Sequence, residues 1–399
     1  MTTDADVAVI GGGPAGLSAA RTLNQAGIGS VLLTRESSPG ATKPCGGFVP
    51  VRCLDEFGLE RFSGCYEVSG VRMSFPGQEP CVVEFDEPVG YNSTRYDLGR
   101  ALLDWAGRGE CQVRLDTVVG AVTEESDRCS LRCHCRGEHY TLHVQMVIDA
   151  SGVNPVSLRS GLVRRRLDAG QLGYAVQYQM RVPSDAKDLE PLNTFLYGRD
   201  YSPGGYAWVF PRRREAAVGT GGLVSRVRSS GRSLHSYIDT ILSSVEPVKA
   251  QLQEAEVTRR EAALLPLSGV VRPSFSRRVL LAGDSAGQCS PITGEGIYYA
   301  MAGGQMAAEV AAEAVKDSGL SSDQLRAYEK RWTRTLGLDL KWGLWLQKRF
   351  TRSGSGTSKA TFLSSERSKR VVAEMLVGRR SVLSAMLSIA PSYVRSHLD

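Results

Sequence analysis

The sequence predicts a mixed α/β fold that begins with a strand–turn–helix unit. An apolar strand at residues 6–10 runs into a glycine-rich turn, and a helical pattern follows the turn. A second apolar strand at residues 279–282 ends in a Gly-Asp turn and precedes another run of small residues at helical spacing. Residues 206–210 alternate aromatic with other side chains, which is the period of a β-strand.

Length and composition limit the fold and the partners. The 399 residues suit two or three closely joined domains, and 42% hydrophobic with 23% charged residues is ordinary for a globular protein. A net charge of +6 is too small to indicate a nucleic acid as partner. The nine cysteines are scattered, and no apolar run reaches the roughly 18 residues of a membrane span, so we expect reduced thiols and a cytoplasmic protein.

Three glycines near the N-terminus form the G-x-G-x-x-G pattern of a dinucleotide-binding turn, with a strand before it and a helix after it. Gly11 allows the tight turn, Gly13 lets a pyrophosphate approach the backbone, and Gly16 lets the helix pack on the strand. The unpaired N–H groups at the start of the helix favour phosphates. This context predicts a dinucleotide site.

The next strand, at residues 30–34, should be followed by an acidic residue that binds the ribose hydroxyls. Thr34 stands at the end of that strand, and Glu36 would point the same way if the strand continued. We therefore predict that Glu36 binds the ribose and that Arg35 lies near the adenine.

The segment 277–315 indicates which dinucleotide binds. Asp284 follows its strand and could hold a ribityl hydroxyl, and the glycine-rich start of the next helix could bring N–H groups to the pyrimidine edge of a flavin. A nicotinamide dehydrogenase has no use for such a remote turn. The sequence therefore predicts FAD as the cofactor.

Six segments occur in an order that resembles a known family. They are GGGPAG at 11–16, KPCGG at 43–47, STRYDLGRALLDWA at 93–106, VIDASG at 147–152, YAWVFP at 206–211 and GDSAGQCSPITGEGI at 283–297. In these segments the chain resembles the geranylgeranyl reductase family of FAD-dependent oxidoreductases, which shares its fold with para-hydroxybenzoate hydroxylase. The likeness covers roughly residues 5–315.

The resemblance implies a Rossmann-like FAD-binding domain interleaved with an antiparallel β-sheet substrate domain, with the flavin between them and a helical region at the C-terminus. The expected limits are 1–165 for the first FAD-binding segment (with a sheet insertion at about 66–94), 166–271 for the substrate domain, 272–315 for the second FAD-binding segment and 316–399 for the helical region.

The resemblance also implies site residues in each segment. For the cofactor, together with Arg35 and Glu36, they are Gly11, Gly13, Ala15, Gly16, Cys45, Gly46, Arg95, Val118, Asp284, Pro291, Gly294, Gly296 and Ile297. For the substrate they are Tyr206, Trp208 and Phe210. No catalytic role is assigned to Asp149.

The aromatic residues of the strand at 206–210 and Cys45 each have a purely structural interpretation as well. The alternating aromatics of residues 206–210, in a strand that Pro211 should end, suit either a sheet core or the wall of an apolar cavity, and the resemblance favours the cavity. Cys45 is either a small buried thiol or a thiol near the reacting alkene that supplies or relays a proton.

The cysteine-rich segment 129–143 suggests zinc at first sight. It fits better as a β-hairpin that turns at residues 136–138, with Cys129, Leu131, Cys133 and Cys135 on one face. The C-x-C spacing lacks the usual C-x-x-C knuckle, so we expect no metal.

The C-terminal tail has a basic composition. Residues 323–350 have a helical pattern, and from Lys341 to Arg380 there are ten basic and two acidic residues, divided by a loop at 353–358. This tail is either a helical layer with a solvated basic face or a lid and a surface for anionic lipid head groups at the membrane.

The resemblance implies an FAD-dependent reductase that saturates carbon–carbon double bonds of a polyprenyl chain on a lipid, quinone or pigment. Reduced flavin would supply a hydride to one alkene carbon, and an acid, with Cys45 and Tyr206 as candidates, would protonate the other. With one G-x-G-x-x-G in the chain, the electron donor is either NADPH or a ferredoxin.

Two alternatives stay open. One is a flavin-dependent monooxygenase or halogenase acting on an aromatic or peptide-bound substrate, which the same fold permits. The other is a membrane-associated flavoprotein that binds a lipid or a partner without turnover. The sequence does not indicate an oligomeric state.

Overall fold

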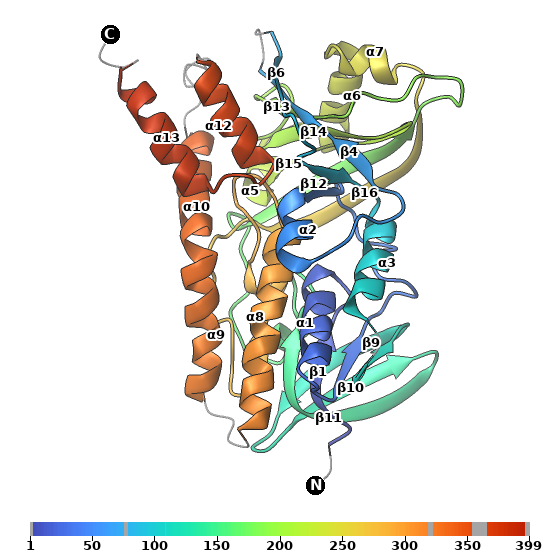
Figure 1. The fold of residues 1–399 in the computed structure, drawn as a ribbon, viewed down its shortest axis with the longest axis vertical. Coiled ribbons are helices and arrows are strands. Elements are labelled where there is room, and N and C mark those ends of the chain that lie inside the picture. Colours follow the sequence, from blue (N-terminus) through green and yellow to red (C-terminus); the bar gives the residue numbers. More distant parts are fainter. Residues whose placement is uncertain (1–2, 76–78, 108, 318–321, 353–364, 396–399) are drawn as a thin grey trace. The chain divides into compact units, whose positions relative to one another are not determined.

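The computed structural model describes residues 3–75, 79–107, 109–317, 322–352 and 365–395 (Figure 1). The loop expected at 353–358 lies outside them. The chain divides into two compact units, one of Met1–Lys43, Arg95–Leu167 and Ser268–Lys341, the other of Pro44–Thr94, Asp168–Leu267 and Trp342–Asp399. The predicted fold class is confirmed, because an α/β unit alternates along the chain with a unit built on a largely antiparallel sheet, in which β13 and β5 alone among the described pairs run parallel. The domain limits drawn from the sequence stay a prediction.

A largely parallel sheet with an antiparallel extension forms the centre of the first unit. Its strand order is β8-β2-β1-β11-β10-β9, and β17 pairs with β11. The strands are β1 (Ala5–Ile10), β2 (Ser30–Leu33), β8 (Cys111–Arg114), β9 (Thr117–Glu124), β10 (Cys129–Cys135), β11 (Glu138–Asp149) and β17 (Val279–Leu281). Strand β1 runs parallel to both β2 and β11. A parallel strand buried on both faces has the continuous apolar sequence that residues 7–10 show.

Helices α1 and α8 of this unit pack so closely that their contact requires glycine. The helices of the unit are α1 (Pro14–Gln25), α3 (Arg95–Ala106), α4 (Val156–Arg159), the short 3₁₀ turn η1 (Gly283–Ala286), α8 (Ile297–Lys316), α9 (Ser322–Thr335) and the start of α10 (Gly337–Arg352). A Cβ built on Gly304 of α8 would lie 2.0 Å from the carbonyl oxygen of Ala15 in α1. The two segments are far apart in the sequence and side by side in the fold (Figure 1).

The cysteine-rich segment forms the predicted hairpin. Strands β10 and β11 pair antiparallel about a turn at Arg136 and Gly137, and Cys129, Leu131 and Cys133 lie in the core. Burial raises the pKa of the Cys129 thiol to about 12 and that of Cys133 to about 11. Thiols that resist deprotonation are poor metal ligands. Within the described residues, no group of three or more His, Cys, Asp or Glu side chains is arranged to hold a metal.

The second unit is built on a sheet with the strand order β16-β12-β15-β14-β13-β5-β6. These strands are β5 (Gly70–Ser74), β6 (Cys81–Glu84), β12 (Leu172–Arg181), β13 (Leu192–Tyr197), β14 (Tyr206–Arg212), β15 (Glu215–Leu223) and β16 (Glu256–Pro266). A small sheet of β3 (Phe48–Pro50), β7 (Gly90–Asn92) and β4 (Tyr66–Val68) belongs to the same unit. Its helices are α2 (Val51–Phe57), α5 (Val224–Ser229), α6 (Leu234–Ser244), α7 (Val248–Leu252), most of α10, α12 (Glu366–Leu376) and α13 (Val382–Arg395).

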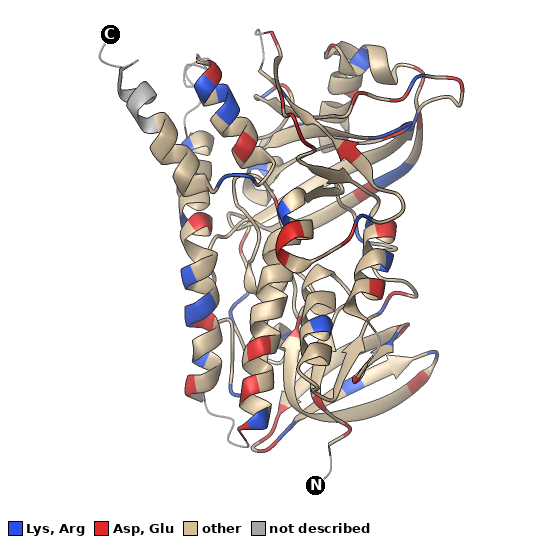
Figure 2. Cartoon of the chain, in the orientation of Figure 1, with Lys and Arg blue, Asp and Glu red and all other residues tan. Residues whose placement is uncertain are grey.

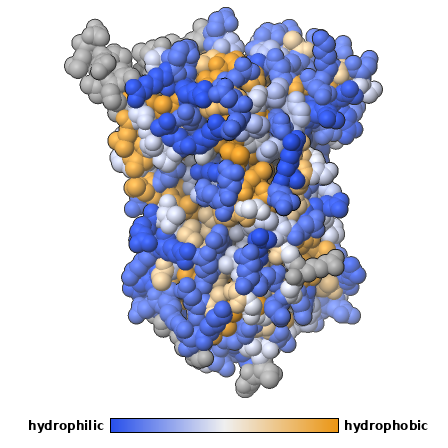
Figure 3. All heavy atoms as spheres, in the orientation of Figure 1, coloured by the Kyte–Doolittle hydropathy of each residue, from blue (hydrophilic) through white to orange (hydrophobic). Residues whose placement is uncertain are grey.

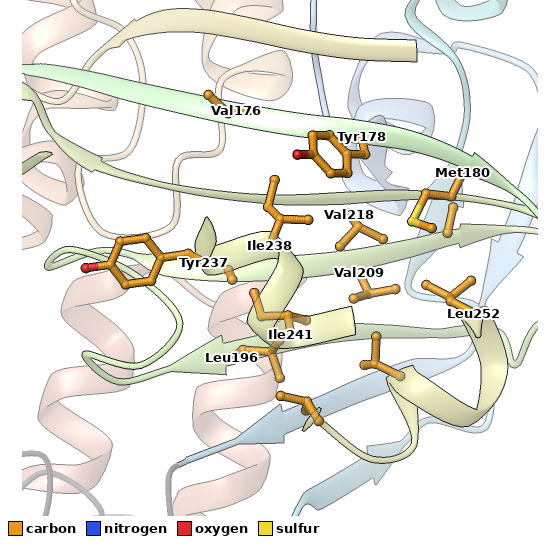
Figure 4. Packing of buried hydrophobic residues seen from close by; sticks show 14 of the residues in the cluster. Val176, Tyr178, Met180, Leu196, Val209, Val218, Tyr237, Ile238, Ile241 and Leu252 are labelled. Atoms are coloured by element: carbon orange, nitrogen blue, oxygen red, sulfur yellow. The ribbon is translucent and has the colours of Figure 1, made fainter. Parts of the chain in front are cut away.

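Helices α6 and α7 cover one face of this sheet (Figure 4). Tyr178 of β12, Val209 of β14 and Val218 of β15 pack there against Ile238 and Ile241 of α6. Because side chains alternate along a strand, the aromatic residues of β14 face the other side of the sheet.

Strand β14 continues past Pro211, so the expectation that this proline ends the strand is wrong. Pro211 pairs with Ala216 of β15, and the strand runs to Arg212. Strand β13 pairs with β14 only as far as Val209, so Pro211 has a strand neighbour on one side alone. A residue without an N–H is tolerated at such an edge. The turn follows at Arg213, whose φ is 59°.

The C-terminal part of the chain is helical, as predicted. Residues 323–350 form α9 and α10, which are separated at Leu336. Ala373 of α12 joins a core with Met73 of β5 and Phe195 of β13. No helix in the part of the chain that the structure describes combines the length and the apolar character that crossing a bilayer would require.

Shortening a side chain at the centre of the core in Figure 4 should destabilise the second unit. Ile238 is fully buried. We expect Ile238→Ala to lower the free energy of unfolding by about 2–5 kcal/mol and Ile238→Val by about 0.5–1.5 kcal/mol, because the larger deletion leaves the larger cavity. Urea unfolding measures both. The control is Leu387→Ala, at a position that is 67% exposed, where we expect a change within about 0.5 kcal/mol. Equal losses at positions 238 and 387 would contradict the described core.

Candidate functional site

The glycine-rich turn is shaped by backbone contacts at its first and last glycines. Gly11 has a φ of 109°, and a Cβ built on it would lie 2.4 Å from the carbonyl oxygen of Ala150. A Cβ on Gly16 would lie 1.8 Å from the carbonyl oxygen of Gly11. Neither position accepts a side chain unless backbone moves, so the turn itself requires glycine at both.

Gly13 is different, because the protein itself does not require glycine there. Apart from Gly13 and its two chain neighbours, no described atom lies within 4 Å of a Cβ built on Gly13, and its φ of −81° suits any residue. Gly13 is the N-cap of α1, where no described side chain caps the helix and the first turn has no acidic residue. Uncapped N–H groups on an open side of a helix N-terminus fit a pyrophosphate.

The Gly-Asp turn lies against this helix end. Gly283 has a φ of 64°, and a Cβ built on it would lie 2.8 Å from the Cβ of Ala15. A Cβ built on Gly296, the N-cap of α8, would lie 3.8 Å from Oδ1 of Asp284. The structure therefore gathers both predicted halves of the cofactor site in the first unit.

Lys43 forms an ion pair with Asp284, a contact that the sequence analysis missed. Its Nζ lies 3.3 Å from Oδ2 of Asp284, and both side chains are partly exposed. A pair of this kind adds little to stability. It places a cation beside the predicted ribityl-binding carboxylate.

Buried polar side chains hold the Gly-Asp turn in place. Gln288 accepts a hydrogen bond from the Gly283 N–H (2.7 Å) and donates one to the Tyr328 hydroxyl (3.0 Å). The Tyr328 hydroxyl donates in turn to the carbonyl oxygen of Leu281 at 2.5 Å. Burial raises the pKa of Tyr328, so it remains a donor at neutral pH. A glutamine inside a run of small residues was the sequence signal that could have revealed this support.

Arg164 is the second such support. It is buried, and its Nε donates to the carbonyl oxygen of Ser285 at 2.8 Å while Nη2 donates to that of Val153 at 2.9 Å. Burial lowers the pKa of Arg164. Asp149 caps the neighbouring segment by accepting from the N–H and hydroxyl groups of Ser151 and Ser157. These residues join the turn after β11 to η1, and the Asp149 carboxylate is occupied by structural bonds.

Glu36 lies in a loop, because β2 ends at Leu33 and does not continue to it. Its carboxylate accepts hydrogen bonds from the backbone N–H groups of Gly40 (2.8 Å) and Thr42 (2.9 Å) and from the Thr42 hydroxyl. Burial alone would raise the pKa of Glu36, but these hydrogen bonds hold it below its usual value. Glu36 therefore organises the loop at 37–42, and ribose binding by Glu36 stays a prediction.

Arg95 shows the clearest sign of an anion site. It begins α3, as predicted, and its Nε and Nη1 are buried with no hydrogen-bond partner among the described residues. A Cβ on Gly40 would lie 2.1 Å from the carbonyl oxygen of Arg95, so the loop that Glu36 organises packs on this helix start. Buried guanidinium nitrogens without a partner are costly, and an FAD phosphate would satisfy them.

The other predicted cofactor residues lie in both units. Arg35 is exposed after β2, Val118 is exposed on β9, Pro291, Gly294 and Ile297 lead into α8, and Cys45 and Gly46 belong to the second unit. Their contacts with FAD stay predictions. The uncapped start of α1, the unpaired Arg95 and the Asp284 turn together fit FAD.

The aromatic strand, Tyr206, Trp208 and Phe210 of β14, is divided between core and accessible surface. Phe210 is buried, with the ring centroids of Phe195 and Phe48 5.3 Å and 6.4 Å away. Tyr206 and Trp208 are half-buried beside this core. Core packing therefore explains Phe210, and substrate contact by the three aromatics stays a prediction.

The cysteine loop, residues 44–47, packs directly on the aromatic strand. A Cβ built on Gly46 would lie 2.8 Å from the ring of Phe210 and 3.3 Å from Nε1 of Trp208. On the next strand, a Cβ on Gly219 would lie 2.2 Å from the Trp208 ring. The structure thus brings Cys45 and the aromatic strand together within one unit.

Comparisons with known proteins agree with this geometry. A family model described as an FAD binding domain matches residues 4–335. The digeranylgeranylglycerophospholipid reductase of Methanosarcina acetivorans is 30% identical over 357 residues, which cover 85% of this chain and 83% of the relative. The chloroplastic geranylgeranyl diphosphate reductase of Arabidopsis thaliana is 30% identical over 349 residues, which cover 82% of this chain and 70% of the relative.

Solved structures share the fold over nearly the whole chain. A geranylgeranyl bacteriochlorophyll reductase-like protein from Thermoplasma acidophilum has a TM-score of 0.85 at 24% identity, covering 97% of this chain and 96% of that one. A flavin-dependent brominase has a TM-score of 0.75 at 17% identity, covering 98% and 99%. At these identities the likeness shows the fold alone.

The fold, the cofactor features and the family model define an FAD-dependent oxidoreductase. The chain belongs to the geranylgeranyl reductase family.

Gly13→Val should abolish tight FAD binding without unfolding the protein. The new side chain meets no protein atom, but it fills the side from which a pyrophosphate would approach. We expect a loss of affinity of at least about tenfold, measured by flavin fluorescence on titration of the apoprotein. Gly120→Val is the matched control, because Gly120 is exposed on β9 and its Cβ would also meet little protein. Full flavin occupancy in Gly13→Val would contradict this assignment.

Proposed function

We propose that this protein saturates carbon–carbon double bonds of a polyprenyl chain carried by a lipid, quinone or pigment. The observation that supports this proposal is the cysteine loop packed on the aromatic strand, in a member of the geranylgeranyl reductase family. An alkene has no charge or hydrogen-bonding group near its reacting carbons, so shape and apolar contact must position it. The names of the two relatives share the geranylgeranyl group and differ in what carries it.

The residues of the chain have three tasks in this reaction. FAD, when bound and reduced, supplies the hydride that one alkene carbon takes. Tyr206 and Trp208 pack against the hydrocarbon and exclude water from it, while Phe210 supports them from the core. The thiol of Cys45 or the hydroxyl of Tyr206 donates the proton that the other carbon takes, and solvent replaces it. The proposed electron donor is NADPH or a ferredoxin.

A monooxygenase or halogenase is the competing proposal, because a brominase shares the fold. That chemistry consumes oxygen, whereas hydride transfer to an alkene does not. The presence or absence of an oxygen requirement therefore separates the two functions.

The reduced holoenzyme should saturate a geranylgeranylated lipid under strict anaerobiosis. We expect products heavier by about 2 mass units per double bond, detected by mass spectrometry, with the fully saturated lipid as an unreactive control. A product that forms only in air and gains about 16 mass units per inserted oxygen would show that the protein is an oxygenase.

Trp208→Ala and Phe210→Ala should separate substrate contact from core packing. Phe210 is buried, so its truncation should lower the free energy of unfolding by about 3–5 kcal/mol. Trp208 is half-buried, and its truncation should mainly reduce turnover of long prenyl chains relative to short ones, per folded molecule. Thermal melting beside turnover measures both. The cavity interpretation is wrong if Trp208→Ala melts much earlier and keeps the wild-type chain-length preference.

We also propose that α10 contacts an anionic lipid surface from which a prenylated lipid would be taken. On α10, Trp345 is 48% exposed, and the Arg349 guanidinium lies 5.9 Å from the centroid of its ring. Lys348 is exposed on the same side of the helix, and basic residues recur along α10 and α12 (Figure 2). Apolar residues also reach the surface over α13, where Leu387 is exposed (Figure 3). Aromatic rings with neighbouring cations suit the interface of an anionic membrane.

Reversing two of these charges should weaken vesicle binding. We expect Lys348→Glu with Arg349→Glu to reduce co-sedimentation with phosphatidylglycerol vesicles by at least about tenfold, since each cation near the surface contributes about 1 kcal/mol. The matched control, Lys187→Glu with Lys249→Glu, makes the same charge change at exposed lysines elsewhere in the second unit. Equal losses in the two double variants would show that net charge alone drives binding.

A further inference from the structure

A row of residues crosses the sheet of the second unit on its aromatic face. The pairing register places Glu261 of β16 opposite Gln177 of β12, Gln177 opposite Gly219 of β15, and Gly219 opposite Trp208 of β14. Gly219 carries no side chain, and a Cβ there would lie 2.8 Å from the Cβ of Gln177 and 2.2 Å from the Trp208 ring. The Gln177 side chain therefore adjoins the aromatic strand across Gly219.

Gln177 connects the cysteine loop to the sheet. It is 3% exposed, and its Nε2 donates to the carbonyl oxygen of Cys45 at 3.0 Å and to Oε2 of Glu261 at 2.5 Å. Both partners accept and neither donates, so they determine the orientation of the amide. Its Oε1 is buried and has no hydrogen-bond partner in the described part of the chain. An amide that leaves one buried atom unpaired is a poor choice for stability alone.

Glu261 holds Gln177 in this orientation. The Glu261 side chain is 7% exposed, and it also accepts from Arg259 and, at 2.8 Å, from Nε2 of Gln179. Gln179 thus binds the same carboxylate oxygen as Gln177, while its own Oε1 accepts from Arg212. The two glutamines have equivalent places on one strand, but Gln177 is the one that binds Cys45.

The rest of the cysteine loop is held by packing and backbone contacts. Gly46 lies against the ring of Phe210. Gly47 has a φ of 90°, and its carbonyl oxygen accepts from the Ser93 N–H at 3.0 Å. The backbone at Cys45 is therefore held by the hydrogen bond from Gln177, and the following residues, Gly46 and Gly47, are held by packing and a backbone hydrogen bond.

We propose that Gln177 is a positioning residue whose orientation is fixed by its hydrogen bond to Glu261. Gln177 determines where the Cys45 thiol lies relative to the aromatic strand. This inference rests on the proposed function in so far as Cys45 serves the alkene. A displacement of about 1 Å can cost a large factor in rate, so a single fixed hydrogen bond at the Cys45 backbone controls proton delivery without touching the substrate.

The test compares two variants of the holoenzyme, Gln177→Leu and Gln179→Leu. Each removes one amide from the Glu261 carboxylate, but only the first releases the Cys45 carbonyl. The first readout is the rate of Cys45 alkylation by iodoacetamide, determined by peptide mapping and divided by the rate at Cys65, a half-buried thiol of the same unit. The second readout is turnover of a geranylgeranylated lipid, separated into kcat and KM.

In Gln177→Leu we expect the Cys45 to Cys65 ratio to rise roughly three- to tenfold, the change that one lost hydrogen bond makes in a local opening equilibrium. The kcat should fall while KM changes little. Gln179→Leu should leave the ratio within about twofold of wild type. Equal changes in both variants, or an unchanged ratio in Gln177→Leu, would overturn the proposal.

A second pair of variants covers the case in which Gln177→Leu does not fold. Glu261→Gln keeps an oxygen that accepts from Gln177 and should preserve the Cys45 ratio, whereas Glu261→Leu should raise it. The same Cys45 to Cys65 alkylation ratio in both Glu261 variants would show that Glu261 does not hold Gln177 in its orientation. Alkylation of Cys45 needs no substrate. A lack of reductase activity in the wild type would therefore refute the proposed function, and the alkylation ratio would still test whether Gln177 positions Cys45.

Discussion

The first unit depends on how closely backbone can approach the start of α1. Ala15 lies against Gly283 and Gly304, and Gly11 lies against Ala150. Each contact exists because one partner lacks a Cβ, and the contacts bring η1 and α8 to α1, the first helix of the chain. Among the described residues, the side of the helix start at Gly13 stays open. A helix end that is packed elsewhere and open there directs its unpaired N–H groups toward a ligand.

Closely packed turns leave buried backbone polar groups without a strand partner, and buried side chains form hydrogen bonds with these groups. Turns carry carbonyl and N–H groups that no strand partner satisfies. Gln288, Tyr328 and Arg164 bind those groups around η1 and the turn after β11. Nε and Nη1 of Arg95, by contrast, are buried and have no hydrogen-bond partner in the described chain. These unpaired nitrogens fit the predicted contact between Arg95 and a phosphate of FAD.

The second unit uses the two faces of one sheet for different purposes. The face toward α6 and α7 is an apolar core. The other face mixes buried Phe210, half-buried Trp208, and the polar Gln177. Core packing therefore explains Phe210, and the interpretation of Tyr206 and Trp208 as the wall of a cavity stays a prediction. Under the proposed function, this face would place the hydrocarbon beside a fixed amide, which suits a reaction that needs apolar contact and a directed proton.

The sequence by itself determined the glycine-rich turn, the start of α3 at Arg95, the Gly-Asp turn, the 129–143 hairpin and the family, because each depends on neighbouring residues whose order is read directly. It misjudged Pro211 and the end of β2, since strand ends depend on which neighbour continues to pair. Only the tertiary structure decided that Gln177 binds both Glu261 and the Cys45 carbonyl, that Lys43 pairs with Asp284, and that Nε and Nη1 of Arg95 have no partner among the described residues. These are contacts between distant segments, and no local pattern in a single sequence encodes them.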